Sequence, residues 1–419
     1  MSHEHDSMSH EAPRASQHSL STPTSSDSKS STSIASQPAA AITGSATSAG
    51  DRRSGSRGRA LGWSSYFEPW FASHAEAGRG VGRVLLSSRG HYRLGGDFGE
   101  RPAELAGRLR QGFDAPDGAE NLPAIGDWVV FDGPSPGEPM SGDGPLRIVE
   151  VLPRRSQLSR KVAGGRTREQ VVAANVDTVF VVMGLDGDYN PRRLERFLTM
   201  IWDSGASPVV LLNKTDLADD PEGRLREIET RSPGVPVHGI SALSGGGTEG
   251  LGPYLEPGRT VVLVGSSGVG KSTLVNRLCG REVVRTGAVR EGDDRGRHTT
   301  THRQLVELPG GALLIDNPGI RELQLWVGEE GLSQTFDEIR RLAEDCRYRD
   351  CSHHDEPGCA VLAAIDQGAL DPERLGNLHA LEREQRHLEL KVDEHARRKE
   401  KKRIAAIHKA AKLHKPRYR

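Results

Sequence analysis

In the first third of the chain, apolar residues come in short runs separated by turn-forming residues. These runs predict five strands, near Val81–Ser87, His91–Leu94, Glu104–Arg110, Asp127–Phe131 and Leu146–Leu152. Clusters of Gly, Pro and Asp, notably residues 134–145, separate several of them. Five short strands in about 80 residues fit a small antiparallel barrel, and the OB-fold is the best-known such barrel that binds oligonucleotides. We therefore predict an all-β OB-fold RNA-binding barrel over residues 78–162.

The pattern then changes to alternating strands and helices. Continuous apolar runs predict strands buried on both faces of a parallel sheet, at Asp177–Gly184, Pro208–Leu212, Val235–Ile240, Thr260–Val264 and Leu313–Ile315. Helical spacing marks Pro191–Trp202 and Leu274–Leu278. Together these elements predict a central α/β domain over residues 168–326. Ligands of such sheets bind beyond the carboxyl ends of the strands, so the loops there are the candidate sites.

The two ends of the chain have a different character. Residues 1–62 are rich in Ser, Thr, Ala and Gly, and no aromatic residue precedes Trp63. Such a segment buries too little apolar surface to offset its ordering entropy, so we expect it to be disordered. Residues 371–414 have few helix breakers and a leucine face, which predicts a helix. We divide this end into a helical domain at 330–395 and a basic tail at 396–419.

Composition adds the compartment and the kind of partner. The chain has 419 residues and a net charge of −1, and no apolar run approaches the roughly 20 residues of a membrane span. It shows no secretory signal, and its clustered cysteines suit a reducing compartment, so we expect a cytoplasmic protein, monomeric by default. Residues 397–419 hold 11 Lys/Arg and one Glu, a balance of +10 that leaves −11 elsewhere. A neutral total is therefore compatible with a polyanionic partner such as RNA.

A glycine-rich segment between a predicted strand and a predicted helix carries the strongest motif. It reads Gly265-Ser266-Ser267-Gly268-Val269-Gly270-Lys271-Ser272-Thr273, a G-x-x-x-x-G-K-[ST] pattern in strand–loop–helix context. The glycines let backbone N–H groups surround an anion at a helix N-terminus. Lys271 would bridge the outer phosphates as part of the catalytic machinery, and the Ser272 hydroxyl would bind Mg²⁺. The segment predicts a nucleotide-binding protein.

Two further loops select the base. Asn213-Lys214-Thr215-Asp216 follows a buried strand, and the Asp216 carboxylate matches the adjacent N1–H and N2–H₂ donors of guanine. Adenine lacks that donor pair, so the loop predicts GTP over ATP. Ser241-Ala242 follows the next strand and would support the base through a backbone N–H and packing.

The loop Asp316-Asn317-Pro318-Gly319 follows the last predicted strand. Asp316 would reach Mg²⁺, through water, and the Gly319 N–H would face the γ-phosphate. The next residue is Ile320, where Ras-like enzymes use a glutamine that orients the attacking water. An isoleucine cannot do this, so we expect slow intrinsic hydrolysis, with the water positioned by another residue or by a partner.

The polar segment Arg295–Thr301 lies between the phosphate-loop helix and Asp316. Thr299 or Thr300 would complete the Mg²⁺ shell when the loop closes over GTP, as a switch does. His298 is a candidate for positioning the catalytic water. A plain surface histidine is an equally open interpretation.

The order of these parts is unusual. The guanine-reading loops come before the phosphate loop, whereas the phosphate loop comes first in ordinary small GTPases. Joining the usual ends and opening the chain elsewhere gives this order, so we predict a circularly permuted GTPase domain. Such a domain ends at its second switch, and whatever follows residue 325 or so is tethered to the nucleotide-sensing element.

The segment that follows contains a compact set of metal ligands. Cys346-x₄-Cys351-x-His353-x₅-Cys359 supplies three thiolates and one imidazole, a closed set for one structural Zn²⁺. His354 is the second choice for the imidazole ligand. The remaining thiol, Cys279, lies on the phosphate-loop helix and is expected in the core.

With these motifs in view, the chain resembles the RsgA/YjeQ family of circularly permuted GTPases that depend on the small ribosomal subunit. The segments that carry the resemblance are Leu152–Ser156, Ala174–Asp177, Asn213–Asp216, Gly265–Thr273, Gly296–Thr301, Asp316–Arg321 and Cys346–Cys359. It covers about residues 80–370. One departure is Asn317, where the family usually has Ser or Thr.

The resemblance implies an N-terminal OB-fold, a permuted GTPase domain and a zinc-binding helical domain. It also implies that the protein acts in late maturation of the small subunit, that the subunit stimulates GTP hydrolysis, and that His298 is the catalytic histidine. From the residues, we expect docking on rRNA through the barrel, the zinc region and the basic tail. Basic residues of the barrel region suited to this are Arg108, Arg110, Arg154, Arg155, Arg160 and Lys161.

Two other functions stay open at this point. One is a GTP-sensing RNA- or ribosome-binding module in which hydrolysis is incidental. The other, more distant, is a P-loop kinase, for which the sequence offers no evident acceptor site or catalytic base.

Overall fold

The computed structural model describes residues 56–88, 90–107, 109–110, 122–132, 144–162, 168–284, 303–316 and 329–392. All of them fall within one compact unit, Thr47–Arg419. None of the described helices is long and apolar enough to cross a membrane. The predicted N-terminal tail up to residue 55 and the predicted basic tail 396–419 lie outside the described residues.

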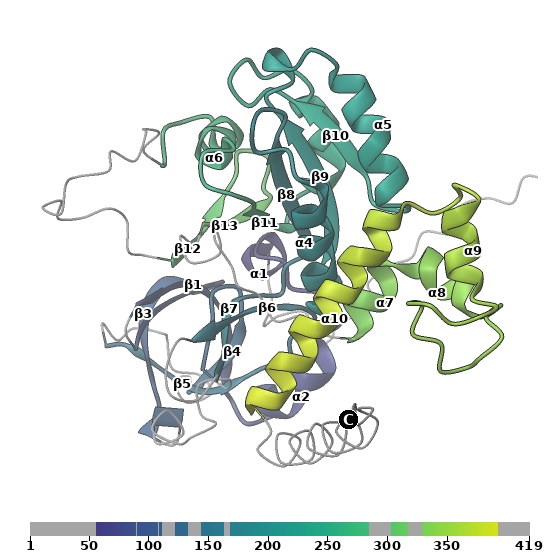
Figure 1. Ribbon diagram of the computed structural model, residues 1–419. Helices are drawn as coiled ribbons and strands as arrows, with labels where there is room; N and C mark the ends of the chain where they lie inside the picture. Colours follow the sequence, from purple (N-terminus) through teal and green to yellow (C-terminus); the bar gives the residue numbers. More distant parts are fainter. Residues whose placement is uncertain are drawn as a thin grey trace, which may run out of the picture. The chain divides into compact units, whose positions relative to one another are not determined.

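Five strands form the N-terminal barrel (Figure 1). They are β1 Gly80–Ser88, β2 His91–Gly96, β3 Gly99–Leu105, β4 Trp128–Asp132 and β5 Leu146–Val151. Hydrogen bonding runs β1-β2-β3-β5-β4, and β4 pairs back to β1 with Val130 opposite Val81, which closes the barrel. Inward-facing side chains such as Val84, Leu94 and Ile148 are fully buried and fill its core. The predicted five-stranded barrel is confirmed.

The third barrel strand lies earlier than predicted. The expected strand at Glu104–Arg110 is wrong, because β3 ends at Leu105 and residues 109–110 are helical. A two-residue turn sets this register by pairing Gly96 with Gly99, whose φ of +81° suits glycine. The strand is hard to recognise in the sequence because it is short of apolar residues and contains Pro102.

The structured part of the chain also begins earlier than expected. Residues 56–62, placed in the disordered tail from composition, include helix α1 (Ser56–Ala60) and the fully buried Leu61. Helix α2 (Glu68–Glu76) follows, and the aromatic residues around its start pack on the barrel. The ring of Trp63 meets Trp128 of β4 edge-on, with centroids 4.9 Å apart. Aromatic burial therefore attaches this N-terminal segment to the barrel.

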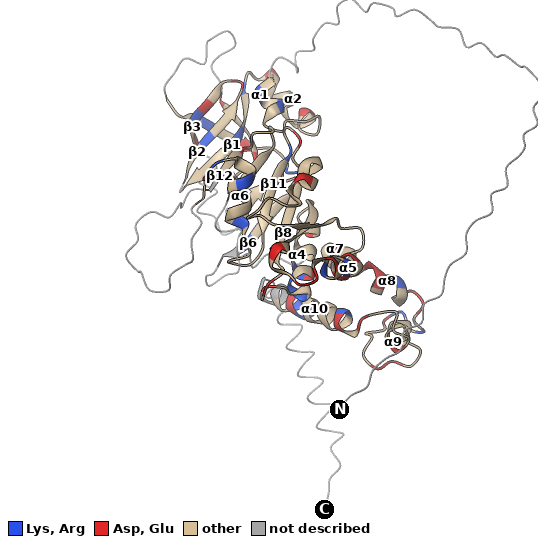
Figure 2. Ribbon diagram, turned by 90° about the horizontal axis from the view of Figure 1, so that it is seen from above, with Lys and Arg blue, Asp and Glu red and all other residues tan. Residues whose placement is uncertain are grey.

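The central domain is built on a mostly parallel sheet in the order β10-β9-β8-β11-β13-β12. The strands are β8 Thr178–Gly184, β9 Ser207–Asn213, β10 Val237–Ile240, β11 Thr260–Val264, β12 Arg303–Glu307 and β13 Leu313–Asp316, and only β12 is antiparallel. All seven residues of β8 are buried, with alternate side chains entering two different core clusters. In Figure 2, β8 and β11 carry no charged residues. The sheet is therefore covered on both faces, as predicted.

Helices cover the two faces of this sheet. Helix α4 (Pro191–Asp203) contributes Leu194, Leu198 and Ile201 to one cluster, and helix α6 (Lys271–Cys279) contributes Leu274 and Val275 to the other. Helix α5 (Pro221–Arg231) packs against β10 at the sheet edge. Both α4 and α5 begin with a side-chain cap followed by proline, the arrangement that favours a helix start.

Several elements were not predicted. Strands β6 (Gln157–Val162) and β7 (Arg168–Ala174) form a separate two-stranded sheet between the barrel and the central domain. Strand β12 pairs with β13 on one side and, through Gln304 and Arg303, with the end of β1 on the other. This pairing makes the barrel and the central sheet one continuous eleven-stranded sheet (Figure 1).

The C-terminal region is helical, as predicted. Its helices are α7 Glu329–Thr335, α8 Asp337–Ala343, α9 Ala360–Asp366 and α10 Pro372–Val392. A buried ion cluster attaches α10 to the central domain: Arg374 lies 3.1 Å from Glu195 of α4, and both side chains are almost fully buried. Arg374 also donates to the carbonyls of Arg231 and Thr335, which lie on α5 and α7. Arg374 Nε also donates to Glu338 of α8, so its guanidinium joins α10 to four other helices.

A second buried arginine joins the barrel to the central domain. Arg83 of β1 is 1% exposed and donates to the carbonyls of Leu61, Gly126 and Asn175, and to the Thr260 hydroxyl at 2.9 Å. Burial lowers the pKa of Arg83 to about 10, against the attraction of Asp177, so the side chain stays charged at neutral pH. It connects four segments far apart in the sequence.

We predict that Arg83→Met lowers the free energy of unfolding by about 3 kcal/mol, because it leaves several buried acceptors without a donor. Urea denaturation of the full chain, followed by tryptophan fluorescence, measures this. Arg93→Met is the matched control: Arg93 also lies in the barrel, but its side chain is 56% exposed, and its loss should cost less than about 0.5 kcal/mol. Equal effects of the two substitutions would contradict the role given to Arg83.

Candidate guanine-nucleotide site and zinc centre

The loops predicted to bind nucleotide gather at one edge of the central sheet. Because the strands are parallel, their carboxyl ends lie side by side, and Gly184, Asn213 and Ile240 are hydrogen-bonded neighbours in register. The phosphate loop follows β11, which pairs with β8 on one side and with β13 on the other. The carboxyl ends of β8, β9, β10, β11 and β13 thus lie along one edge of the sheet, although they span residues 184 to 316.

Three glycines give the phosphate loop its shape. Gly265, Gly268 and Gly270 have φ values of +140°, +81° and +97°. A Cβ on Gly265 would lie 2.1 Å from the Val182 carbonyl, and one on Gly270 would lie 2.2 Å from the Asn213 amide nitrogen. Only glycine fits at these two positions, which explains their place in the motif.

Lys271 begins helix α6 directly after this loop. It is 6% exposed, and its Nζ donates to the carbonyls of Gly265, at 2.8 Å, and Ser266. The ammonium group is therefore held inside the loop, beside the N-terminus of the helix. Both features favour the binding of phosphate there. Ser267 is exposed on the same loop, while Ser272 and Thr273 are partly buried in the first turn of α6.

Asn213 connects the guanine motif to the phosphate loop. Its side chain is buried; Nδ2 donates to the Val269 carbonyl at 2.7 Å, and Oδ1 accepts from the Ala242 N–H at 2.8 Å. Ser241 and Ala242 are also buried at this junction. The Ala242 N–H, predicted to support the base, is thus engaged by Asn213 in this structure. One amide ties together three loops.

The rest of the guanine motif forms the rim of the site. Lys214 has a left-handed backbone with a φ of +69°, and Asp216 is exposed on the short 3-10 helix that follows. The Lys214 Nζ lies 2.5 Å from Asp186, just beyond β8. This hydrogen bond lowers the pKa of Asp186, against the effect of partial burial. Asp186 is not among the residues predicted from the sequence, although its position after a buried strand marks it as a neighbour of the other loops.

Asp316, the predicted Mg²⁺-side carboxylate, ends β13 and is 8% exposed. The register that pairs Ile315 with Val262 places it next to the strand that leads into the phosphate loop. His298, Thr299, Thr300 and Gly319 lie outside the described residues.

The barrel-region arginines are largely occupied within the protein. Arg154 makes a two-pronged ion pair with the buried Asp127, with both N–O distances at 2.8 Å. Arg155 pairs with Asp177 at 3.0 Å, and Arg160 bonds Gln170. Arg154 is therefore a structural residue and not a free phosphate ligand as predicted. Arg110 remains well exposed; Arg108 and the side chain of Lys161 lie outside the described part.

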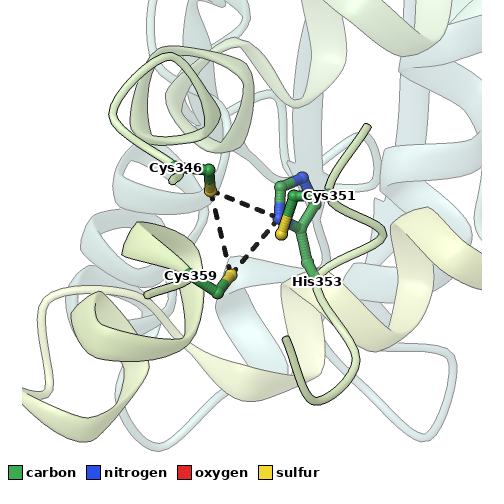
Figure 3. Close-up of side chains that lie close together, drawn as sticks. All are labelled: Cys346, Cys351, His353 and Cys359. Atoms are coloured by element: carbon green, nitrogen blue, oxygen red, sulfur yellow. Dashed lines mark hydrogen bonds between the residues drawn. The ribbon is translucent and has the colours of Figure 1, made fainter. Parts of the chain in front are cut away.

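The predicted zinc ligands come together in the C-terminal region (Figure 3). The Sγ of Cys346 lies 3.9 Å from that of Cys359, and the His353 Nδ1 is 3.7 Å and 3.4 Å from these sulfurs. With Cys351, all four ligand atoms lie within 4.8 Å of one another. A tetrahedral zinc with Zn–S bonds of about 2.3 Å needs ligand atoms about 3.5–3.8 Å apart. The donor set and its spacing therefore fit one zinc ion.

Local structure explains why His353 and not His354 enters this cluster. His353 has a positive φ of 58°, and its ring points into the cluster (Figure 3). His354 points elsewhere: its Nδ1 lies 2.8 Å from the Ser352 carbonyl, and its ring stacks on His379 of α10. Cys359 also caps helix α9 by accepting from the Leu362 N–H. Cys279, the last residue of α6, is buried in the core, as predicted.

Known protein families and relatives match this chain. The RsgA GTPase family model matches residues 151–326, and a model of a 50S ribosome-binding GTPase matches residues 260–409. The second match begins at β11, directly before the phosphate loop, as expected if the guanine-reading strands have been moved in front of it. The small ribosomal subunit biogenesis GTPase RsgA of Opitutus terrae is 45% identical over 352 residues, which cover 83% of this chain and 95% of that protein.

The chain belongs to the RsgA family.

It is thus a small ribosomal subunit biogenesis GTPase with a circularly permuted GTPase domain. The relative from Methanosarcina acetivorans is 52% identical over 260 residues, covering 62% of this chain and 69% of that protein. The crystal structure of YjeQ from Thermotoga maritima has 26% identity and a TM-score of 0.53, covering 73% of this chain and 98% of that one. YloQ, a circularly permuted GTPase, shares the fold at 24% identity and a TM-score of 0.51, over 73% of this chain and 95% of that one.

We predict that the purified chain contains about one zinc per molecule, because the four ligands form a closed tetrahedral set. Cys346→Ser should lower the zinc content by more than about half, measured by atomic emission, and lower the thermal stability of the helical region. Cys279→Ala serves as the control, since Cys279 lies on α6 and is not one of the four ligands. This substitution should leave the zinc content unchanged. Zinc retained in full by Cys346→Ser would refute this prediction.

Proposed function

We propose that the chain hydrolyses GTP to GDP and phosphate during late maturation of the small ribosomal subunit, and that the subunit stimulates this hydrolysis. The observation that carries the proposal is the buried Asn213 amide, which joins the guanine motif to the phosphate loop. In this proposal Asp216 reads the base and Lys271 binds the phosphates, and the Asn213 contact links the loop that carries the one to the loop that carries the other. The named relatives support the role in small-subunit biogenesis.

The predicted site residues have separate roles in binding the nucleotide and Mg²⁺. Backbone N–H groups of residues 265–273 surround the phosphates, and Lys271 bridges the outer ones. Asp216 accepts from the guanine N1–H and N2–H₂, and Ser241 and Ala242 form the wall beside the base. Ser272 and Asp316, together with Thr299 or Thr300, are the residues that would hold Mg²⁺. When bound, this ion neutralises charge on the phosphate oxygens.

The attacking water needs a positioning group other than a glutamine. Ile320 follows the Asp-Asn-Pro-Gly segment and has no polar atom in its side chain. We assign the role to His298, in the polar segment before β12, and the contact to the γ-phosphate to the Gly319 N–H. Slow turnover by the chain alone and faster turnover on the subunit follow from this arrangement.

We further propose that the protein acts as a monomer in the cytoplasm, where it docks on rRNA through the barrel, the zinc region and the basic C-terminal tail. Zinc would be structural, since three thiolates and one imidazole leave no open position. The +10 balance of residues 397–419 suits contact with RNA phosphates. Because Arg154 and Arg155 form ion pairs within the protein, we expect other basic residues of the barrel, such as the exposed Arg110, to contact RNA.

A second candidate is a GTP-sensing module whose binding to the ribosome matters and whose hydrolysis is incidental. The observation that favours it is Ile320, because a sensor does not need an efficient water-positioning group. Normal subunit maturation by protein locked in the GTP state would support this alternative.

We predict that isolated small ribosomal subunits raise GTP turnover by at least about tenfold, since a partner can supply the missing transition-state contacts. Phosphate release, measured with and without subunits, is the assay. The stimulation should fall as salt rises from low to moderate concentration, because phosphate-backbone contacts release counterions. GTP binding without stimulation would mean a wrong partner, and preference for ATP would point to a kinase.

His298→Ala should lower subunit-stimulated turnover by about 10²-fold, the scale of losing a group that positions or deprotonates water. GDP affinity should change by less than about twofold, since the histidine is assigned to the water and not to the base or the phosphates. The control is His91→Ala, at an exposed position of the barrel. Unchanged stimulated turnover in His298→Ala removes the histidine from the mechanism.

A further inference from the structure

The loop that supports the guanine is held from two sides. On one side the Ala242 N–H donates to Asn213 Oδ1, and Asn213 in turn binds the Val269 carbonyl in the phosphate loop. On the other side Arg277 of helix α6 donates Nε to the Ala242 carbonyl at 2.8 Å and Nη2 to the Leu243 carbonyl at 2.5 Å. Asn213 belongs to a recognised motif, whereas Arg277 belongs to none.

These contacts close a ring. Helix α6 begins at Lys271, two residues after Val269, so the chain itself joins the phosphate loop to Arg277. Arg277 lies six residues into the helix, about 9 Å along its axis at 1.5 Å per residue. From there its planar guanidinium reaches two consecutive carbonyls with two different nitrogens, Nε and Nη2, held in a rigid fork. The phosphate loop and the guanine loop are therefore fixed to each other through two separate routes.

The loop is shaped to receive the guanidinium. Its backbone closes on itself, since Gly245 N–H donates to the Ser241 carbonyl at 2.7 Å and Ser241 N–H to the Gly246 carbonyl at 2.9 Å. A Cβ on Gly245 would lie 2.4 Å from the Arg277 Nη1, so this position, with a φ of +99°, leaves room for the arginine. The next side chain on the rim, Leu243, is 76% exposed. By binding the Leu243 carbonyl, Arg277 fixes the peptide unit that carries this exposed side chain.

We propose that Arg277 is a positioning residue of the guanine site: it locks the 241–247 loop onto the phosphate-binding helix and so sets the selectivity for the base. This rests on the proposed guanine-nucleotide binding. Arg277 touches the loop and not the nucleotide. Its loss leaves the phosphate loop intact, because Lys271 and the three glycines of that loop do not depend on it. Base-dependent affinity should therefore suffer more than phosphate-dependent affinity.

The test compares GDP and ADP binding to the full chain by isothermal titration calorimetry. The wild-type chain should prefer GDP strongly. In Arg277→Met, which keeps the aliphatic stem and removes every donor, we expect the GDP Kd to rise about tenfold and the ADP Kd to change by less than about twofold, which narrows the selectivity. Arg277→Lys, which keeps hydrogen-bond donors but loses the rigid planar fork, should recover part of the loss.

Arg281→Met is the matched control, because Arg281 is exposed just beyond the same helix and bonds neither Ala242 nor Leu243. It should leave both affinities unchanged. An equal rise of both Kd values in Arg277→Met, accompanied by a lower melting temperature, would mean that the arginine only stabilises the fold and would overturn the inference. So would unchanged selectivity. A wild-type chain that does not discriminate GDP from ADP would instead refute the proposed function.

Discussion

A buried amide links the two loops on which the nucleotide site depends. A polar side chain taken out of water must find partners for its donor and its acceptor, and Asn213 finds them in two different loops, at Val269 and Ala242. If the two loops moved apart, the buried donor or acceptor of Asn213 would lose its hydrogen bond, which costs free energy. The phosphate loop and the guanine loop are therefore held at a fixed separation. This constraint survives the permutation of the chain, because it depends on which strands are neighbours and not on the order in which they are made.

Elements that follow from local pattern were predictable from the sequence. Continuous apolar runs gave β8, β9 and β11 correctly, since a strand covered on both faces must be apolar at every position. The phosphate loop was predictable because glycine is required where a Cβ would collide, as at Gly265 and Gly270. The Cys₃His cluster was predictable because its residues are close in sequence, and the structure brings the same four together.

The features that were missed depend on partners distant in sequence. Arg83 looks like any charged residue in a strand, and only the fold shows that Thr260, 177 residues away, lies beside it. Arg154 looked free for RNA because its partner Asp127 stands 27 residues earlier, in a buried position. Strand β3 was misplaced because a hairpin turn and two neighbouring strands stabilise it in spite of its charged residues and Pro102. Tertiary context overrides local propensity in all three cases.

The pairing of β12 with β1 affects how the protein can be divided. In the intact chain, β12 has a hydrogen-bonding partner on each side. A fragment that started at Thr178 would keep the central sheet but strip β12 of its barrel neighbour and leave backbone groups on that side unpaired. Exposed strand edges are templates for association between molecules. The isolated GTPase fragment should therefore aggregate more readily than the whole chain. The barrel thus has a second role, because its strand β1 covers this edge of the central sheet.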